Sequence, residues 1–409
     1  MKKILSLLAV LTLATACIYP YQPDLEDAPE GILVVDGNLM VGEKSQVRIG
    51  FMSSLWPKPG QSQSGELVYY TRAAGTGSVR VWAEDDGGGV YEGALDMAAS
   101  SAANPNTPFS IDLENAPDDR SYRVCVQAGN DRYSSDWIKP LAPPVIKNVT
   151  FGIPKLTTGK TDVTVSASLD GGPDATGYLL LTYEETWRFH AEYYPNYIYI
   201  PASNSVTERV YPAWDRYWCW KISDKGTQVP VDYTGMTSAS LKSFPFHSFS
   251  RYDNRNHQRY SILLTARTID KDTYMYLNHL EESTESGDNL FSPNPGEVSG
   301  NLRCENDPER MVMGYVTVAR TTSVRTYLDS RYLLTRQPNL YDLAYPPQWP
   351  KISGGAWWGE FYEMGYMPLV ENTLPPSDAD FGPYGWGPLT CYDCIAAGGT
   401  QTRPDFWEE

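Results

Sequence analysis

The sequence predicts a mainly β protein made of two consecutive β-sandwich domains of the immunoglobulin or fibronectin type. The second domain is expected to carry one helix and a long C-terminal tail rich in proline, glycine and tryptophan. Two observations predict this class. Tyrosine, glycine and proline are abundant, with 29, 33 and 31 residues, and this mixture favours strands and turns over helices. Short segments also alternate apolar and polar side chains, as half-buried strands do.

The first sandwich is predicted over residues 31–142. Its turns include Asp-Asp-Gly-Gly-Gly at 85–89 and Gly-Asn-Asp at 129–131, and such residues are typical of hairpins. Short strands at this spacing indicate an immunoglobulin-like sandwich. The candidate strands all carry alternating apolar or β-branched residues and lie at 32–38, 46–51, 78–84, 90–92, 121–128 and 132–137.

The second β-domain is predicted over residues 143–409, beginning at two adjacent prolines. One helix is expected at about 272–286, with Asp272 as N-cap and Tyr274 and Leu277 following at helical spacing. From Leu334 the chain holds too many tryptophans for a disordered tail, so we expect the tail to pack along this domain. The clearest strand patterns lie at 145–151, 161–169, 177–184 and 311–320.

Residues 1–16 have the layout of a secretory signal peptide, with two lysines, an apolar run and small residues before Cys17. The run is far shorter than the ~20 residues of a membrane-spanning helix. Residues 13–17 resemble the bacterial lipoprotein signal, which predicts a diacylglycerol on Cys17 and a tether over 17–30. Ordinary cleavage after Ala16 is the alternative. A lipidated Cys17 would hold the mature protein on a membrane.

The chain is acidic, with 50 aspartates and glutamates against 33 lysines and arginines, which gives a formal charge of −17. Such a charge argues against nucleic-acid binding and against adsorption to anionic lipid heads. Membrane association is therefore expected to depend on the covalent lipid.

Five of the six cysteines follow the lipidation site, and in an oxidising compartment four of them can form two bridges. Cys125 lies in an apparent strand and is expected to be a buried free thiol. The candidates for structural disulfides are Cys219, Cys304, Cys391 and Cys394. The favoured pairs are Cys219 with Cys304 and Cys391 with Cys394, but sequence alone does not fix the connectivity.

The spacing Cys391-x-x-Cys394 also occurs in redox motifs and in half of a zinc site. A redox motif of this kind needs a βαβ context, and a zinc site needs two further ligands. The histidines, at 190, 247, 257 and 279, show no ligand spacing. We therefore expect no metal and no cofactor.

Aromatic residues are concentrated at 187–220 and again at 349–386. One interpretation is a platform for sugar rings or peptide side chains, or an interface at which large rings supply most of the binding energy. The alternative is that most of these rings alternate along strands and pack a sandwich core. The candidate ligand or partner surface consists of Trp187, Tyr193, Tyr194, Trp214, Trp357 and Trp358.

Catalytic motifs are absent from the sequence: it has no Gly-x-Ser-x-Gly elbow, no His-Glu-x-x-His and no phosphate loop. Glu184 and Glu185 are adjacent carboxylates beside Trp187, but neighbours on a strand point to opposite faces. They cannot form the carboxylate pair of a glycosidase. We therefore predict that the protein is not an enzyme and has no catalytic residues.

Several short motifs resemble, in their order and spacing, the Bacteroidota lipoprotein family called domain of unknown function 4249. They are Leu-Val-Val-Asp-Gly at 33–37, Tyr-Glu-Glu-Thr-Trp at 183–187, Gly-Tyr-Val-Thr-Val at 314–318 and the C-terminal segment from Cys391 to Trp407. Members of that family are outer-membrane lipoproteins often encoded beside TonB-dependent transporters. The resemblance implies a transporter-accessory role by analogy and supplies no catalytic residues.

The predicted function is that of an outer-membrane-anchored lipoprotein acting as a binding or accessory subunit. It would capture a peptide or glycan for a TonB-dependent barrel, with no nucleic-acid partner. The alternative is a structural or adhesive surface lipoprotein with no soluble ligand. Display on the cell surface is favoured only slightly over the periplasmic face. Surface-exported lipoproteins of this group tend to carry acidic residues just after the lipidated cysteine, whereas the first acidic residue here is Asp24.

Overall fold

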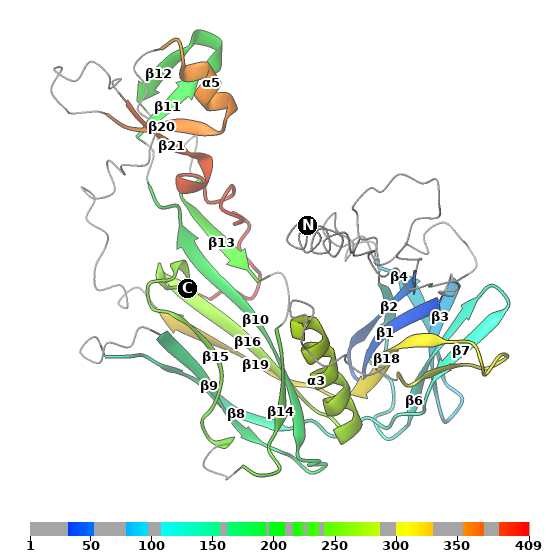
Figure 1. Cartoon of the computed structure of the whole chain (residues 1–409). Helices are drawn as coiled ribbons and strands as arrows, with labels where there is room; N and C mark the ends of the chain where they lie inside the picture. The colour runs from blue at the N-terminus through cyan, green and yellow to red at the C-terminus, as the bar shows by residue number, and fades with distance from the viewer. Residues whose placement is uncertain are drawn as a thin grey trace, which may run out of the picture.

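The computed structural model describes residues 32–52, 79–96, 108–155, 162–193, 196–208, 216–223, 227–236, 241–286, 300–329, 355–371 and 384–408, with the elements labelled in Figure 1. The predicted signal peptide at 1–16, Cys17 and the tether lie outside these residues. The protein is mainly β, as predicted, and its strands form two lobes and a small head. Among the described residues, no helix combines the length and the apolar character that crossing a membrane requires.

The first lobe contains a nine-stranded sheet in the order β17-β7-β6-β3-β4-β5-β2-β1-β18. The sheet curls over its own core, because a side chain on Gly37 of β1 would touch both Val47 and Val124, a residue of the distant strand β6. The N-terminal strands are β1 Ile32–Met40, β2 Lys44–Met52, β3 Val79–Asp85, β4 Val90–Leu95, β5 Phe109–Asp112, β6 Tyr122–Ala128 and β7 Asp131–Ser135. Alternation, β-branched residues or hairpin turns in the sequence predict all of these except β5, a strand of four residues.

Two strands from the C-terminal part of the chain complete this sheet. β17 (Leu302–Cys304) pairs with β7, and β18 (Val312–Ala319) runs parallel to β1. Residues 302–319, which the sequence analysis assigns to the second domain (143–409), therefore belong to the first lobe. A parallel pair needs a long connection between its strands, so no local pattern in the sequence reveals that β1 and β18 are neighbours.

Gly314 allows β18 to approach β1. Its φ is +106°, and a Cβ at this position would lie 1.9 Å from the carbonyl oxygen of Val35. We expect Gly314→Ala to lower the free energy of unfolding by about 3 kcal/mol or more, because strain and a backbone clash add. Urea-induced unfolding followed by circular dichroism measures this loss.

Gly42 provides the matched control. Its φ is +97°, but nothing lies within 4 Å of a Cβ built there. Gly42→Ala should therefore cost only the penalty for a left-handed residue, about 1 kcal/mol. Equal losses in the two variants would contradict the close approach of β18 to β1.

The second lobe is a sandwich of two sheets. One sheet has the order β13-β10-β16-β19, with β14 also paired to β10, and the other has the order β15-β9-β8. Apolar side chains from both sheets, such as Val165 and Leu181, share one core, as expected for face-to-face packing. The elements are β8 Val145–Gly152, β9 Asp162–Asp170, β10 Tyr178–His190, β13 Trp218–Ile222, β14 Thr227–Asp232, β15 Phe244–Ser250, η5 Asn254–Asn256, β16 Arg259–Thr268 and β19 Thr322–Asp329.

The predicted helix is confirmed as α3, Lys271–Ser286. Its N-cap is Asp270 rather than the expected Asp272, because the Asp270 carboxylate accepts the backbone N–H of Thr273 at 2.7 Å. The helix connects the lobes. Tyr274 packs on Tyr178 of β10, while Tyr276 stacks on Tyr315 of β18 with ring centroids 4.2 Å apart.

A third cluster, which we call the head, comprises residues 191–193, 196–208, 355–371 and 384–392. Figure 1 shows it beyond the ends of β10 and β13, at the opposite end of the second lobe from α3. Its core holds Tyr193, Tyr199 and the fully buried Trp386. Its elements are β11 Tyr197–Ile200, η4 Pro201–Ser203, β12 Ser205–Glu208, α5 Trp358–Glu363, β20 Tyr366–Glu371, β21 Tyr384–Pro388 and η6 Leu389–Cys391.

The C-terminal residues pack across the second lobe. Thr400 forms two backbone hydrogen bonds with Trp220 of β13, at 2.7 and 2.8 Å. The buried ring of Trp407 then lies between Trp220 and Tyr327 of β19. The tail thus covers strands at both edges of one sheet.

The disulfide connectivity corrects the favoured pairing. Cys219 of β13 is bonded to Cys394, with Cα atoms 5.6 Å apart, and Cys125, Cys304 and Cys391 are free. Cys304 lies on β17 in the first lobe, whereas Cys219 lies in the second, so the expected bridge between them is wrong. The expected Cys391–Cys394 bridge is wrong because Cys394 turns toward β13. Cys125 is buried and free, as predicted.

Candidate functional site

The structure separates the six aromatic candidates. Tyr193, Trp357 and Trp358 come together in the head. Trp187 lies in the core of the second lobe. Tyr194 and Trp214 fall outside the described residues.

Trp187 is a buried core residue. Its indole N–H donates to the side-chain oxygen of Asn254 at 3.1 Å, and the guanidinium of Arg255 lies over its ring, 4.7 Å from the centroid. Every one of these contacts is internal, so the side chain is not available to a ligand in this structure.

The head exposes large apolar side chains around α5. Trp357 is 52% exposed, Tyr362 40% and Met364 60%. Sequence analysis selected Trp357 but missed the other two, because a short helix in a loop-rich tail gives no periodic signal. Exposed side chains of these types often supply the binding energy of protein interfaces.

The two chain segments of the head hold each other in place. The hydroxyl of Tyr199 donates to Asn204 at 2.9 Å, and the amide of Asn204 donates to the carbonyl of Gly355 at 3.0 Å. The ring of Trp358, the first residue of α5, packs on the buried ring of Trp386 of β21, with centroids 6.3 Å apart. These contacts give the exposed side chains of α5 a fixed support.

A buried carboxylate lies in the second lobe. Glu185 accepts hydrogen bonds from His247 at 2.9 Å, from Arg255 at 2.8 Å and from the hydroxyl of Tyr260 at 3.0 Å. Burial raises the pKa of Glu185, but the bonds from His247 and Arg255 outweigh burial and lower the pKa to about 2. Glu184 points to the opposite face, 3.5 Å from Arg325, as strand alternation requires. The two carboxylates therefore do not form a pair.

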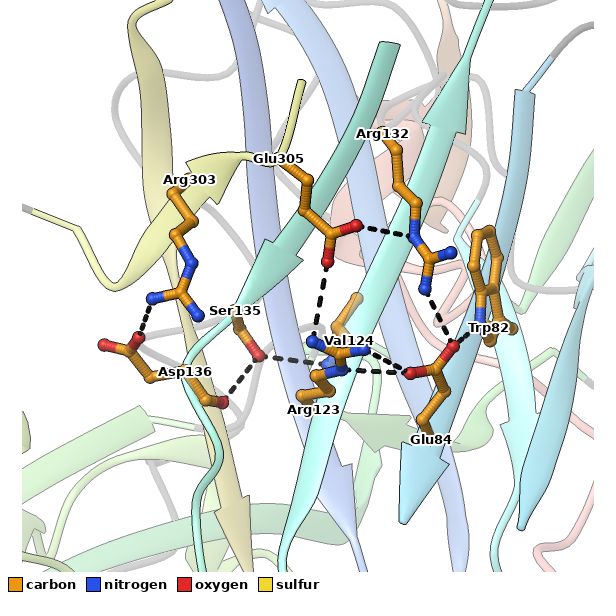
Figure 2. A network of polar contacts seen from close by, with 9 residues as sticks. All are labelled: Trp82, Glu84, Arg123, Val124, Arg132, Ser135, Asp136, Arg303 and Glu305. Atoms are coloured by element: carbon orange, nitrogen blue, oxygen red, sulfur yellow. Dashed lines mark hydrogen bonds and ion pairs between the residues drawn. The ribbon is translucent and has the colours of Figure 1, made fainter. Parts of the chain in front are cut away.

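Figure 2 shows a charged network on the first lobe that involves Glu84, Arg123, Arg132 and Glu305. Glu84 accepts bonds from Trp82, at 2.8 Å, and from both arginines. Glu305, just after β17, pairs with the same two arginines at 3.5 and 2.9 Å. The charges are satisfied within the lobe, so the network fastens the segment after β17 to β6 and β7 rather than presenting a site.

A cleft of about 750 Å³ lies between α3, β18 and the segment 136–141. Tyr315 lies on its wall, with its hydroxyl 3.3 Å from that of Thr273. Burial raises the pKa of Tyr315, and the nearby carboxylates raise it further. The acidic and aromatic lining residues are Asp136, Trp137, Asp270, Asp272, Tyr276 and Tyr315. Sequence analysis missed the cleft because its walls come from distant parts of the chain.

Within the described ranges, no three histidine, cysteine, aspartate or glutamate side chains are grouped in a way that could hold a metal ion.

Comparisons with known proteins give one family. The chain matches the family described as "Domain of unknown function (DUF4249)" over residues 18–325, more than half of its length. No curated protein matches the chain. Among solved structures, it matches a chain described under "Structural basis for Dscam isoform specificity" at 10% identity and a TM-score of 0.14. That match covers 58% of this chain and 48% of the other, so the chain spans about half of that structure's length.

Proposed function

The chain belongs to the DUF4249 family, and from this membership we propose that it is a lipid-anchored outer-membrane protein. In this proposal it serves as an accessory subunit of a TonB-dependent transporter and captures a peptide or glycan for import. The observation that carries the proposal is the set of exposed apolar side chains around α5, on a head supported at the far end of the molecule.

The anchor supports the membrane part of the proposal. The first seventeen residues have the pattern of a lipoprotein signal ending in Cys17, and a proline- and tyrosine-containing segment connects it to β1. Because the chain carries a formal charge of −17, anionic lipid heads repel it. A covalent lipid therefore accounts better for membrane association than surface charge does.

The position of the head supports the accessory part. β10 begins beside α3, where Tyr178 packs on Tyr274, and ends next to the head. Its thirteen residues span about 40 Å at the usual rise of an extended strand. The head can therefore contact a partner at a distance from α3 and the first lobe.

A pull-down from native membranes tests the proposal. Full-length tagged protein should recover a β-barrel transporter in stoichiometric amount from detergent-solubilised membranes, identified by mass spectrometry. The double variant Trp357→Ala/Met364→Ala should recover at least about tenfold less, because it removes two exposed anchors of the interface.

The control is the double variant Tyr252→Ala/Met311→Ala. It removes an exposed aromatic and an exposed methionine, 60% and 50% exposed, outside the head, and should recover the barrel as the wild type does. Recovery of no barrel by the wild type would contradict the accessory role and favour a structural or adhesive surface lipoprotein. Equal recovery by both double variants would contradict docking through the head.

A further inference from the structure

The cleft between the lobes carries an excess of negative charge. Three carboxylates, Asp136, Asp270 and Asp272, line it, against one lysine, Lys139. Two of the carboxylates already have partners within the protein. Asp270 caps α3, and Asp136 forms an exposed ion pair with Arg303 at 2.9 Å.

Asp272 differs from the other two. It lies in the first turn of α3 and is exposed at the cleft. Within the described part of the chain, its carboxylate accepts no hydrogen bond and pairs with no cation. It therefore remains able to bind a cationic group of a ligand.

Aromatic rings form the other part of the wall. Tyr276 and Tyr315 stack with an interplanar angle of 20°, which gives a rigid surface that joins α3 to β18. Trp137 is 43% exposed, and the guanidinium of Arg123 already lies over its ring, 4.6 Å from the centroid. Long basic side chains bind such surfaces well, because their methylenes pack on rings while their charge reaches a carboxylate.

The size of the cleft limits the ligand. A volume of about 750 Å³ falls in the range of pockets that hold small molecules and short peptides. An anionic ligand is disfavoured by the lining carboxylates and by the formal charge of −17 on the chain. A neutral sugar would gain nothing from the excess charge.

We propose that the cleft between α3 and β18 binds a short peptide through a lysine or arginine side chain held by Asp272 against the aromatic wall. The proposal narrows the ligand class of the proposed function and rests on its capture role. It is independent of docking through the head, so its test uses the isolated protein and no transporter.

Isothermal titration calorimetry on the full-length protein in detergent tests the proposal. The probe is trilysine with an acetylated N-terminus and an amidated C-terminus. The uncharged control peptide is triglutamine with the same two end groups. Trilysine should bind and triglutamine should not. The affinity for trilysine should fall severalfold between about 0.02 M and about 0.3 M salt, because screening weakens exposed charge pairs.

Two variants locate the site. Asp272→Asn should weaken trilysine binding about tenfold, since it removes one charge-assisted hydrogen bond. Trp137→Ala should weaken it about fivefold through loss of the aromatic wall. Glu309→Gln, which neutralises an exposed carboxylate outside the cleft, should leave binding unchanged.

Three results would overturn the proposal. The first is no binding of trilysine by the wild type, which would leave the pull-down result unaffected. The second is equal weakening by Asp272→Asn and Glu309→Gln, which would place the charge effect outside the cleft. The third is tight, salt-independent binding of maltotriose in place of trilysine, which would make the ligand a neutral glycan.

Discussion

Replacing Glu185 with alanine is expected to lower the free energy of unfolding by about 3 kcal/mol or more. The carboxylate lies in the core of the second lobe and accepts bonds from His247, Arg255 and the fully buried Tyr260. Its removal takes away one carboxylate partner of Arg255, which also pairs with Asp253, and leaves the hydroxyl of Tyr260 without its acceptor. A buried polar group without a partner is costly. Urea-induced unfolding, followed by tryptophan fluorescence, measures the loss.

The neighbouring residue is the control. Glu184 lies on the other face of β10, with its side chain 42% exposed and its carboxylate 3.5 Å from Arg325. Because exposed ion pairs contribute little, Glu184→Ala should cost less than about 1 kcal/mol. A loss in Glu184→Ala as large as that in Glu185→Ala would contradict the burial of Glu185.

The difference between wild type and Glu185→Ala should also depend on pH. The pKa of Glu185 in the folded protein is about 2, below the ordinary value of 4.5. A depressed carboxyl pKa contributes stability that is fully present above pH 4.5 and is lost as the pH falls toward 2. The gap between the two unfolding curves should therefore shrink over this interval and stay constant above it. A constant gap down to pH 2 would contradict the lowered pKa.

Removing the disulfide is the second change with a large expected effect. The bond joins Cys219 to Cys394 across a sequence separation of 175 residues. The double variant Cys219→Ala/Cys394→Ala should lose about 2–5 kcal/mol, because the unfolded chain regains the freedom of a long loop. The tail should also loosen. The disulfide reinforces the backbone hydrogen bonds by which Cys394 and Thr400 attach the tail to the segment 216–220, and without it these bonds open more easily. Limited proteolysis should then cut the chain after residue 394 first.

Cys391→Ser is the matched control for the disulfide. Its thiol is free, and burial, with the charge of Glu192, raises the pKa of Cys391 to about 11, which keeps the thiol protonated and unreactive. This variant should keep nearly full stability. Mass spectrometry of unreduced peptides from an Asp-N digest, which cuts between Cys391 and Cys394 before Asp393, should find Cys219 joined to Cys394. A bridge between Cys391 and Cys394 would contradict the structure.

Local patterns predict much of the fold. Alternation along 161–169 and 177–184 anticipates β9 and the first half of β10, and helical spacing anticipates α3. The same alternation places Glu184 and Glu185 on opposite faces. In each case the signal lies within one element, where the periodicity of side chains follows directly from the backbone.

Contacts between distant segments could not be predicted in this way. The parallel pairing of β1 with β18 brings together residues about 280 positions apart, as in Leu33 opposite Val312, and nothing in either segment specifies the other. The head joins residues near 200 to residues near 360 and 386 by ring packing. The cleft depends on the placement of β18 beside β1 and of α3 against β18, so its residues show no motif.

Site-specific photo-crosslinking in intact cells tests the central claim most directly. A photoreactive amino acid replaces Trp357 in the head in one strain and Glu309 in the first lobe in another, and mass spectrometry identifies the crosslinked partner. The account predicts a TonB-dependent β-barrel crosslinked through position 357 and not through position 309. A lipidated protein at the outer membrane that crosslinks to no barrel from position 357 would contradict the proposed accessory role.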